Sequence, residues 1–69
     1  MKSKMRLECV NKKKNVSKFW EYKILGSMVN VKYGRIGTFG NGLLIPLYQL
    51  NSKLKEKARK GYKEVKQKN

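Results

Sequence analysis

Residues 18–35 read KFWEYKILGSMVNVKYGR, and this stretch decides the fold. Apolar and polar residues alternate on both sides of the pair Gly26-Ser27, a pattern typical of two antiparallel strands. A Gly-Ser pair between strands favours a two-residue type II′ turn, because glycine readily takes a positive φ at the first turn position. The turn then sets three cross-strand pairs on one apolar face: Ile24 with Val29, Tyr22 with Val31, and Trp20 with Tyr33.

Two cations lie at the open end of this predicted hairpin. Its register places Lys18 beside Arg35, directly beyond the Trp20–Tyr33 pair. Side chains alternate between the two faces of a strand, so a slip of one residue would move the apolar set to the wrong face. We therefore expect this register, with cations and aromatic rings together at the mouth of the hairpin.

Further strands flank the hairpin in the sequence. Met5–Val10 alternates with period two and predicts a first strand, which a charged loop joins to the hairpin. A short fourth strand is expected around Leu43–Ile45, after a glycine-rich turn region. Tyr62–Val65 predicts either a short additional strand or a docked tail.

The C-terminal third has the pattern of an amphipathic helix. Its apolar stripe consists of Leu47, Leu50, Leu54 and Ala58. Pro46 suits the first helical turn, and Gly61 suits the position just after the last. The outer face should present lysines to solvent, namely Lys53, Lys55, Lys57 and Lys60. The predicted fold is α+β: a small antiparallel sheet of three or four strands with one C-terminal helix packed on one face.

The composition excludes most kinds of catalysis. The 69 residues carry 18 Lys and Arg against four Asp and Glu, a formal charge of +14, and there is no histidine. Without histidine there is no imidazole base and no catalytic triad. One cysteine and four scattered glutamates do not make a metal site. We expect a basic binding module that is not an enzyme, has no catalytic residue and needs no metal or cofactor.

The length indicates a single domain, residues 1–69, with a core of about residues 5–65 and basic ends that fray. The longest apolar stretch has eight residues, whereas a membrane span needs about 20, so no membrane association is expected. We expect a monomeric, cytoplasmic protein, associated with the nucleoid if it is bacterial.

Three motifs in order resemble a WGR domain. They are Lys18-Phe19-Trp20, then Tyr33-Gly34-Arg35-Ile36-Gly37-Thr38, then Glu56-Lys57 with Lys60-Gly61-Tyr62. The resemblance extends from about Leu7 to Val65. It implies an antiparallel sheet packed by a helix. WGR domains occur in DNA-break-sensing poly(ADP-ribose) polymerases, where they bind DNA near a 5′-phosphorylated end, and as small bacterial proteins. The chain resembles a small bacterial or phage-like protein of this kind, without the polymerase catalytic domain.

The resemblance also implies roles for individual residues. Contacts to the terminal nucleotide fall on Tyr33 and Arg35, and a phosphate contact falls on Lys18. The chain departs from the family pattern in having Tyr33 where a tryptophan is usual and Ser17 where an asparagine is usual. The stretch between Gly42 and Glu56 is also several residues shorter. The full set of expected nucleic-acid-binding residues is Lys12, Lys13, Lys14, Ser17, Lys18, Tyr33, Gly34, Arg35, Lys57 and Lys60.

The sequence thus predicts a non-enzymatic module that binds the backbone of nucleic acid, duplex DNA rather than RNA, with a preference for 5′-phosphorylated ends or nicks. Lysine and arginine would supply affinity by neutralising phosphates and releasing counterions. The alternative is a basic interaction subunit of a larger nucleoprotein complex, docking on RNA or on an acidic protein. Salt-dependent binding to bare duplex DNA would separate the two.

Overall fold

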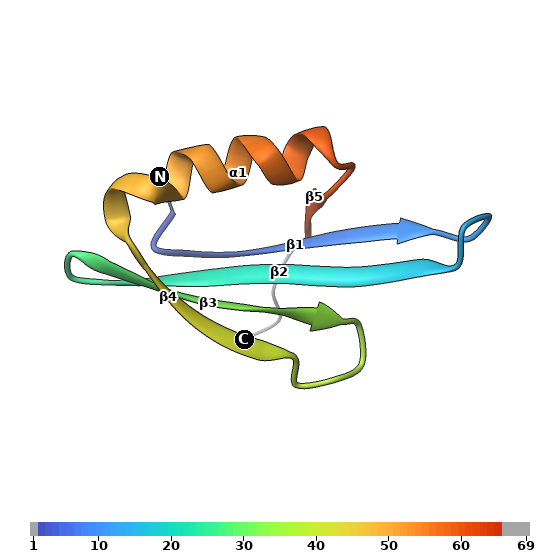
Figure 1. The fold of residues 1–69 in the computed structure, drawn as a ribbon, viewed down its shortest axis with the longest axis horizontal. Coiled ribbons are helices and arrows are strands. Elements are labelled where there is room, and N and C mark those ends of the chain that lie inside the picture. The colour runs from blue at the N-terminus through green and yellow to red at the C-terminus, as the bar shows by residue number, and fades with distance from the viewer. Residues whose placement is uncertain (1, 66–69) are drawn as a thin grey trace.

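The computed structural model describes residues 2–65 and forms a five-stranded antiparallel sheet with one helix across it (Figure 1). The strands are β1 (Lys4–Asn11), β2 (Val16–Leu25), β3 (Met28–Arg35), β4 (Asn41–Pro46) and β5 (Lys63–Val65). Their order in the sheet is β4-β3-β2-β1-β5. A short 3₁₀ turn, η1 (Leu47–Gln49), leads into α1 (Leu50–Arg59). The expected fraying of residues 66–69 lies outside the described residues.

The central hairpin has the predicted register. Leu25 lies opposite Met28, Trp20 opposite Tyr33, and Lys18 opposite Arg35. Gly26 has a φ of 64° and Ser27 does not have a positive φ, the pattern of a type II′ rather than a type I′ turn. The turn chemistry and the apolar pattern therefore specify the same pairing.

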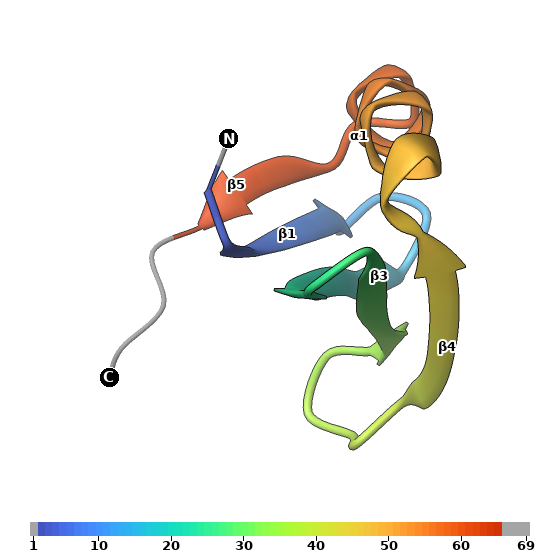
Figure 2. The same cartoon turned by 90° about the vertical axis from the view of Figure 1, so that its left-hand side faces the viewer.

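The predicted strand count of three or four is too low. The β4 strand is longer than expected because its ladder with β3 runs from Asn41 to Pro46. Residues 63–65 form β5 rather than a docked tail, and they pair with β1 from Arg6 to Glu8. The sheet is strongly curved, with α1 lying across one face (Figure 2).

The helix begins later than predicted. Pro46 ends β4 instead of opening the helix, and α1 starts at Leu50. Proline is acceptable there because β4 is an edge strand. At the other end, Gly61 donates to the Ala58 carbonyl at 3.2 Å and Tyr62 to the Lys57 carbonyl at 3.0 Å, the paired bonds of a Schellman motif. The predicted glycine stop is confirmed.

The core lies between α1 and the inner face of the sheet, by which we mean the face that carries Trp20. Its buried members are Leu7, Trp20, Tyr22, Val29, Val31, Ile45 and Leu50. Only part of the expected helix stripe takes part, because Leu47 is in η1 and Ala58 is exposed. The hydroxyl of Tyr22 donates to the Lys2 carbonyl at 2.8 Å, and Ile24 donates to the Ser3 carbonyl at 2.7 Å, which anchors the chain from residue 2.

A second, smaller buried centre lies on the outer face. Phe19 is 2% exposed although no helix covers it. The Arg6 guanidinium lies 4.4 Å from the centre of its ring and donates to Glu8 and Glu21, each at 2.8 Å. The loop after β3 closes the other side, where a Cβ on Gly40 would lie 2.8 Å from Phe19 Cζ. Arg6 and this loop together keep water from the ring.

Gly40→Ala should destabilise the protein much more than Gly37→Ala. Both glycines have positive φ, 71° and 93°, so both variants carry a backbone cost of about 1–2 kcal/mol. A Cβ on Gly40 would also lie 2.2 Å from the Tyr33 carbonyl oxygen, whereas one on Gly37 meets nothing within 4 Å. We expect a further loss of about 1–3 kcal/mol for Gly40→Ala, measured by urea unfolding. Equal losses in the two variants would contradict this packing.

Candidate nucleic-acid interface

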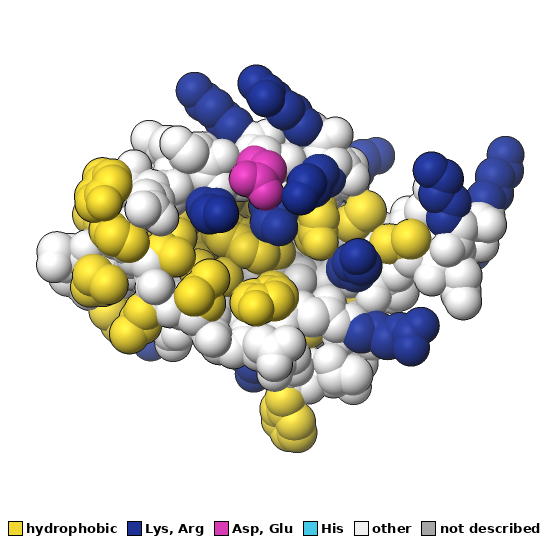
Figure 3. Space-filling model, in the orientation of Figure 1, with side chains coloured by type: hydrophobic (Ala, Val, Ile, Leu, Met, Phe, Trp, Pro, Cys, Tyr) yellow, Lys and Arg dark blue, Asp and Glu magenta, His cyan; other side chains and the backbone are white. Residues whose placement is uncertain are grey.

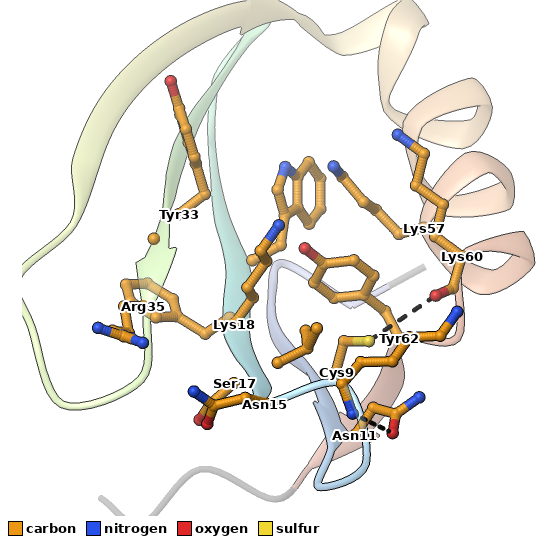
Figure 4. Close-up of a pocket in the computed structure, with 15 residues that line it drawn as sticks. Cys9, Asn11, Asn15, Ser17, Lys18, Tyr33, Arg35, Lys57, Lys60 and Tyr62 are labelled. Carbon is orange, nitrogen blue, oxygen red and sulfur yellow. Dashed lines mark hydrogen bonds between the residues drawn. The ribbon is translucent and has the colours of Figure 1, made fainter.

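A groove runs along the inner face where α1 leaves the sheet uncovered. It has a volume of about 770 Å³. The open end of the β2–β3 hairpin forms one wall, and the end of α1 with Tyr62 forms the other (Figure 4). The loop between β1 and β2 closes a third side with Lys14 and Asn15. The groove therefore gathers residues from both ends of the chain.

Five cations line the groove and no carboxylate does, among the residues described. They are Lys14, Lys18, Arg35, Lys57 and Lys60. Each of the four glutamates pairs elsewhere or at the margin: Glu8 and Glu21 with Arg6, Glu64 with Lys2, and Glu56 with Lys60 at 3.3 Å. Within residues 2–65, no carboxylate lies within 4 Å of Lys14, Lys18, Arg35 or Lys57. Four of the five groove cations therefore have no carboxylate partner among the described residues, and the groove is positive.

Aromatic rings form the base of the groove between these cations. Trp20 is 4% exposed and forms part of the core, whereas its cross-strand partner Tyr33 is 39% exposed. Tyr62 is half-buried, and the Lys57 ammonium lies 5.2 Å from the centre of its ring. An exposed ring beside a guanidinium can pack on a sugar or base whose phosphate the cation binds.

Comparison of the sequence with models of protein families shows the family to which the chain belongs. A family model described as the WGR domain matches residues 3–69. The chain belongs to the WGR domain family. This agrees with the resemblance seen in the sequence, and WGR domains are binding modules associated with nucleic acid.

A crystal structure of a Bacteroides fragilis protein, a structural-genomics target, resembles this WGR domain with a TM-score of 0.80 and 27% identity. The alignment covers 91% of this chain and 19% of that chain, so this WGR domain spans about a fifth of its length. A search of curated proteins finds no match.

Most of the predicted binding residues converge on the groove of this WGR domain. Those that line it are Lys14, Ser17, Lys18, Tyr33, Gly34, Arg35, Lys57 and Lys60. Lys12 and Lys13 do not; they lie exposed in the β1–β2 loop. The Asn11 side chain accepts hydrogen bonds from the amides of Lys13 and Lys14, at 3.1 and 3.3 Å, which shapes that loop.

The positions expected for Lys53 and Lys57 on the outer helix face are wrong: Lys53 is half-buried and lies beside Leu43 and Ile45. Lys57 is half-buried and lines the groove. The reason is helical spacing: Lys57 follows Leu50 by seven residues and Leu54 by three, so all three share the face that packs on the sheet. This spacing was available in the sequence, but the charge of Lys57 masked it.

Other groove residues were not predicted as binding residues. They include Cys9, Asn11, Asn15 and Tyr62. The Cys9 thiol donates to the Lys60 carbonyl at 3.7 Å and so ties β1 to the end of α1. Asn15 has a φ of 54°, a conformation that asparagine tolerates better than most residues. Asn11 and Asn15 flank a run of lysines, which was the only sign of a binding role in the sequence. That they share a groove with the end of α1 depends on the tertiary fold.

The positive charge of the groove affects the pKa of Lys57. Burial lowers the pKa of its ammonium, and Lys60, Lys53 and Lys18 lower it further, while Glu56 raises it. Burial likewise raises the pKa of the Tyr62 hydroxyl. A bound anion would favour the charged form of Lys57 and reverse part of its shift.

Affinity for a duplex should therefore fall as the pH rises into the alkaline range. Lys57 loses its proton at a lower pH than an ordinary lysine, and the phosphate-bound form must retain that proton. We expect this loss of affinity to begin at a lower pH than that at which an ordinary lysine loses its proton, in titrations at constant ionic strength. Lys57→Arg should flatten this part of the profile, because arginine stays charged. The exposed Lys55→Arg is the control and should leave the slope unchanged; identical slopes in both variants would contradict the assignment to Lys57.

Proposed function

We propose that this WGR domain binds nucleic acid in the groove, through the backbone, with a preference for duplex ends or nicks that carry a 5′-phosphate. The observation that carries the proposal is the set of five cations around exposed aromatic surface, with no carboxylate among the described lining residues. Family membership supports nucleic acid as the ligand. In this proposal the nucleic acid is duplex DNA and the protein acts as a monomer.

The pairing of Lys18 with Arg35 favours a terminal phosphate over an internal one. Both side chains lie on the inner face at the mouth of the hairpin, next to Tyr33. A terminal phosphate carries an additional charge and exposed oxygens, so it accepts a bidentate, charge-assisted bond from a guanidinium better than a phosphodiester does. Tyr33 could then pack on the terminal sugar or base, for about 1 kcal/mol.

The described residues point to backbone rather than base recognition. Cations dominate the groove, and α1 packs on the sheet instead of standing free as a recognition helix. Lysine and arginine bound to phosphates set affinity and orientation but carry no sequence information. Within residues 2–65 there is no helix long and apolar enough to cross a membrane, and no group of three or more His, Cys, Asp or Glu placed to hold a metal ion.

Binding to any duplex should weaken steeply with salt. Six or more phosphate contacts would lose on the order of 10³-fold in affinity between about 50 and 200 mM salt, because counterions must be displaced again. Titrations of duplex DNA, single-stranded DNA and duplex RNA at both salt concentrations would measure the slope and rank the ligands. A flat response would refute backbone binding, and a higher affinity for duplex RNA would refute the preference for DNA.

Arg35→Ala should remove the preference for a phosphorylated end. On a nicked hairpin duplex with a 5′-phosphate we expect a loss of about 1–3 kcal/mol, and a smaller loss on the same duplex without it. Lys55→Ala is the matched control, since Lys55 is exposed on α1 and does not line the groove. Its loss should be small and equal on both duplexes. Equal affinity of the wild type for the two duplexes would leave only unspecific basic binding.

A further inference from the structure

The end of the molecule opposite the groove has a different surface. Residues 41–52 contain no charged residue, in a chain in which 32% of residues are charged. Several large apolar side chains of this region and of the β2–β3 turn are exposed: Leu25, Met28, Leu43, Leu44, Leu47 and Tyr48. Figure 3 shows hydrophobic side chains gathered at one end and cations gathered toward the other. The domain thus has a second surface that the proposed function does not use.

This surface includes the free edge of the sheet. The β4 strand is one edge of the strand order β4-β3-β2-β1-β5. Leu25 and Met28 close the hairpin turn as a hydrogen-bonded pair, so alternation directs the backbone groups of Val29, Val31 and Tyr33 toward β4. Their partners Ile45, Leu43 and Asn41 bond inward. The amides and carbonyls of Gly42 and Leu44 therefore point away from the sheet.

The β4 edge lacks the usual protection of an edge strand. Exposed edges are normally made short or protected by lysines, bulges or a covering helix, because unpaired backbone groups recruit another strand. The β4 strand has six residues, carries no charge and pairs with β3 in an unbroken ladder. Pro46, at its end, is the one residue of β4 that cannot offer an amide.

The two sides of this edge differ in chemistry. On the outer face, Leu44 is 61% exposed and lies near Met28, since Asn30 pairs with Leu44 and Met28 with Pro46. On the inner face, Lys53 and Lys57 lie beside Leu43 and Ile45, around a hollow of about 130 Å³. A strand added to β4 would therefore meet apolar surface on one face and ammonium groups on the other.

We infer that β4 is a docking edge for an extended protein segment in which apolar and acidic residues alternate. The segment would bond to the outward backbone groups of Gly42 and Leu44 and place its apolar side chains beside Leu44. Its carboxylates would face Lys53. The net charge of +14 disfavours a second copy of this chain as the occupant and favours an acidic one. This mode of binding is strand addition, in which the backbone supplies affinity and the side chains supply selectivity.

The test uses the peptide Glu-Val-Glu-Leu-Glu-Val-Glu, capped at both ends, and nuclear magnetic resonance of the whole chain. We expect binding with the largest amide shifts and slowed hydrogen exchange at Gly42 and Leu44. A peptide of the same composition in blocks, Glu-Glu-Glu-Glu-Val-Leu-Val, controls for charge alone. Equal binding of the two peptides, or shifts confined to Lys18, Arg35 and the groove, would overturn the inference, as would the absence of binding.

Backbone pairing is tested separately from side-chain contact. Leu44→Pro removes the outward amide together with the leucine side chain and should weaken binding about fivefold, whereas Leu44→Ala removes the side chain but keeps that amide and should weaken binding less. Two peptides N-methylated on alternate residues need no change in the protein: one should bind as the parent does and the other should lose binding. If both N-methylated peptides bind equally well, the segment does not add as a strand. Addition of duplex DNA should leave the Gly42 and Leu44 shifts in place; their loss would place the peptide in the groove.

Discussion

The pairing of β2 with β3 across the Gly26-Ser27 turn is the constraint on which both faces of the sheet depend. It places Trp20 and Tyr22 against Val31 and Tyr33 on the inner face, and Phe19 against Gly34 on the outer face. Because side chains alternate with a period of two, shifting one strand by a single residue would turn Trp20 away from the core and turn Glu21 and Lys23 toward it. The same pairing that builds the core therefore sets Lys18 and Arg35 side by side at the groove.

The outer face shows how a sheet covered by one short helix buries a second aromatic ring. The Arg6 guanidinium stacks over Phe19 and is held in place by Glu8 and Glu21. Half of the four carboxylates in the chain are thereby used on one structural arginine. The cations of the groove consequently have few internal partners, and their field is available to an anionic ligand.

Local patterns in the sequence predicted much of this structure. The hairpin register, the glycine stop after α1, and the meeting of Lys18, Tyr33 and Arg35 all follow from alternation and turn chemistry. The length of β4 and the pairing of β5 with β1 could not be predicted, because they depend on partners distant in sequence.

The burial of two side chains was not predicted, for a different reason. Lys57 was assigned to solvent because of its charge, although its helical spacing placed it on the packed face. Phe19 lies on the mostly polar outer face, and its burial there depends on Arg6 and the loop to Gly40, which local pattern does not reveal. Long cationic side chains cover apolar surface with their stems, so charge alone is a poor guide to burial.

The two walls of the groove come from segments that are far apart in the sequence. One wall is made by β2 and β3, and the other by residues 57–62, which reach the sheet through the Schellman motif and the three-residue strand β5. No fragment that ends before β5 contains both walls in place, so the site cannot be carried by a hairpin or a helix alone. The site is complete only when β5 pairs with β1, so it depends on a contact between the two ends of the described chain.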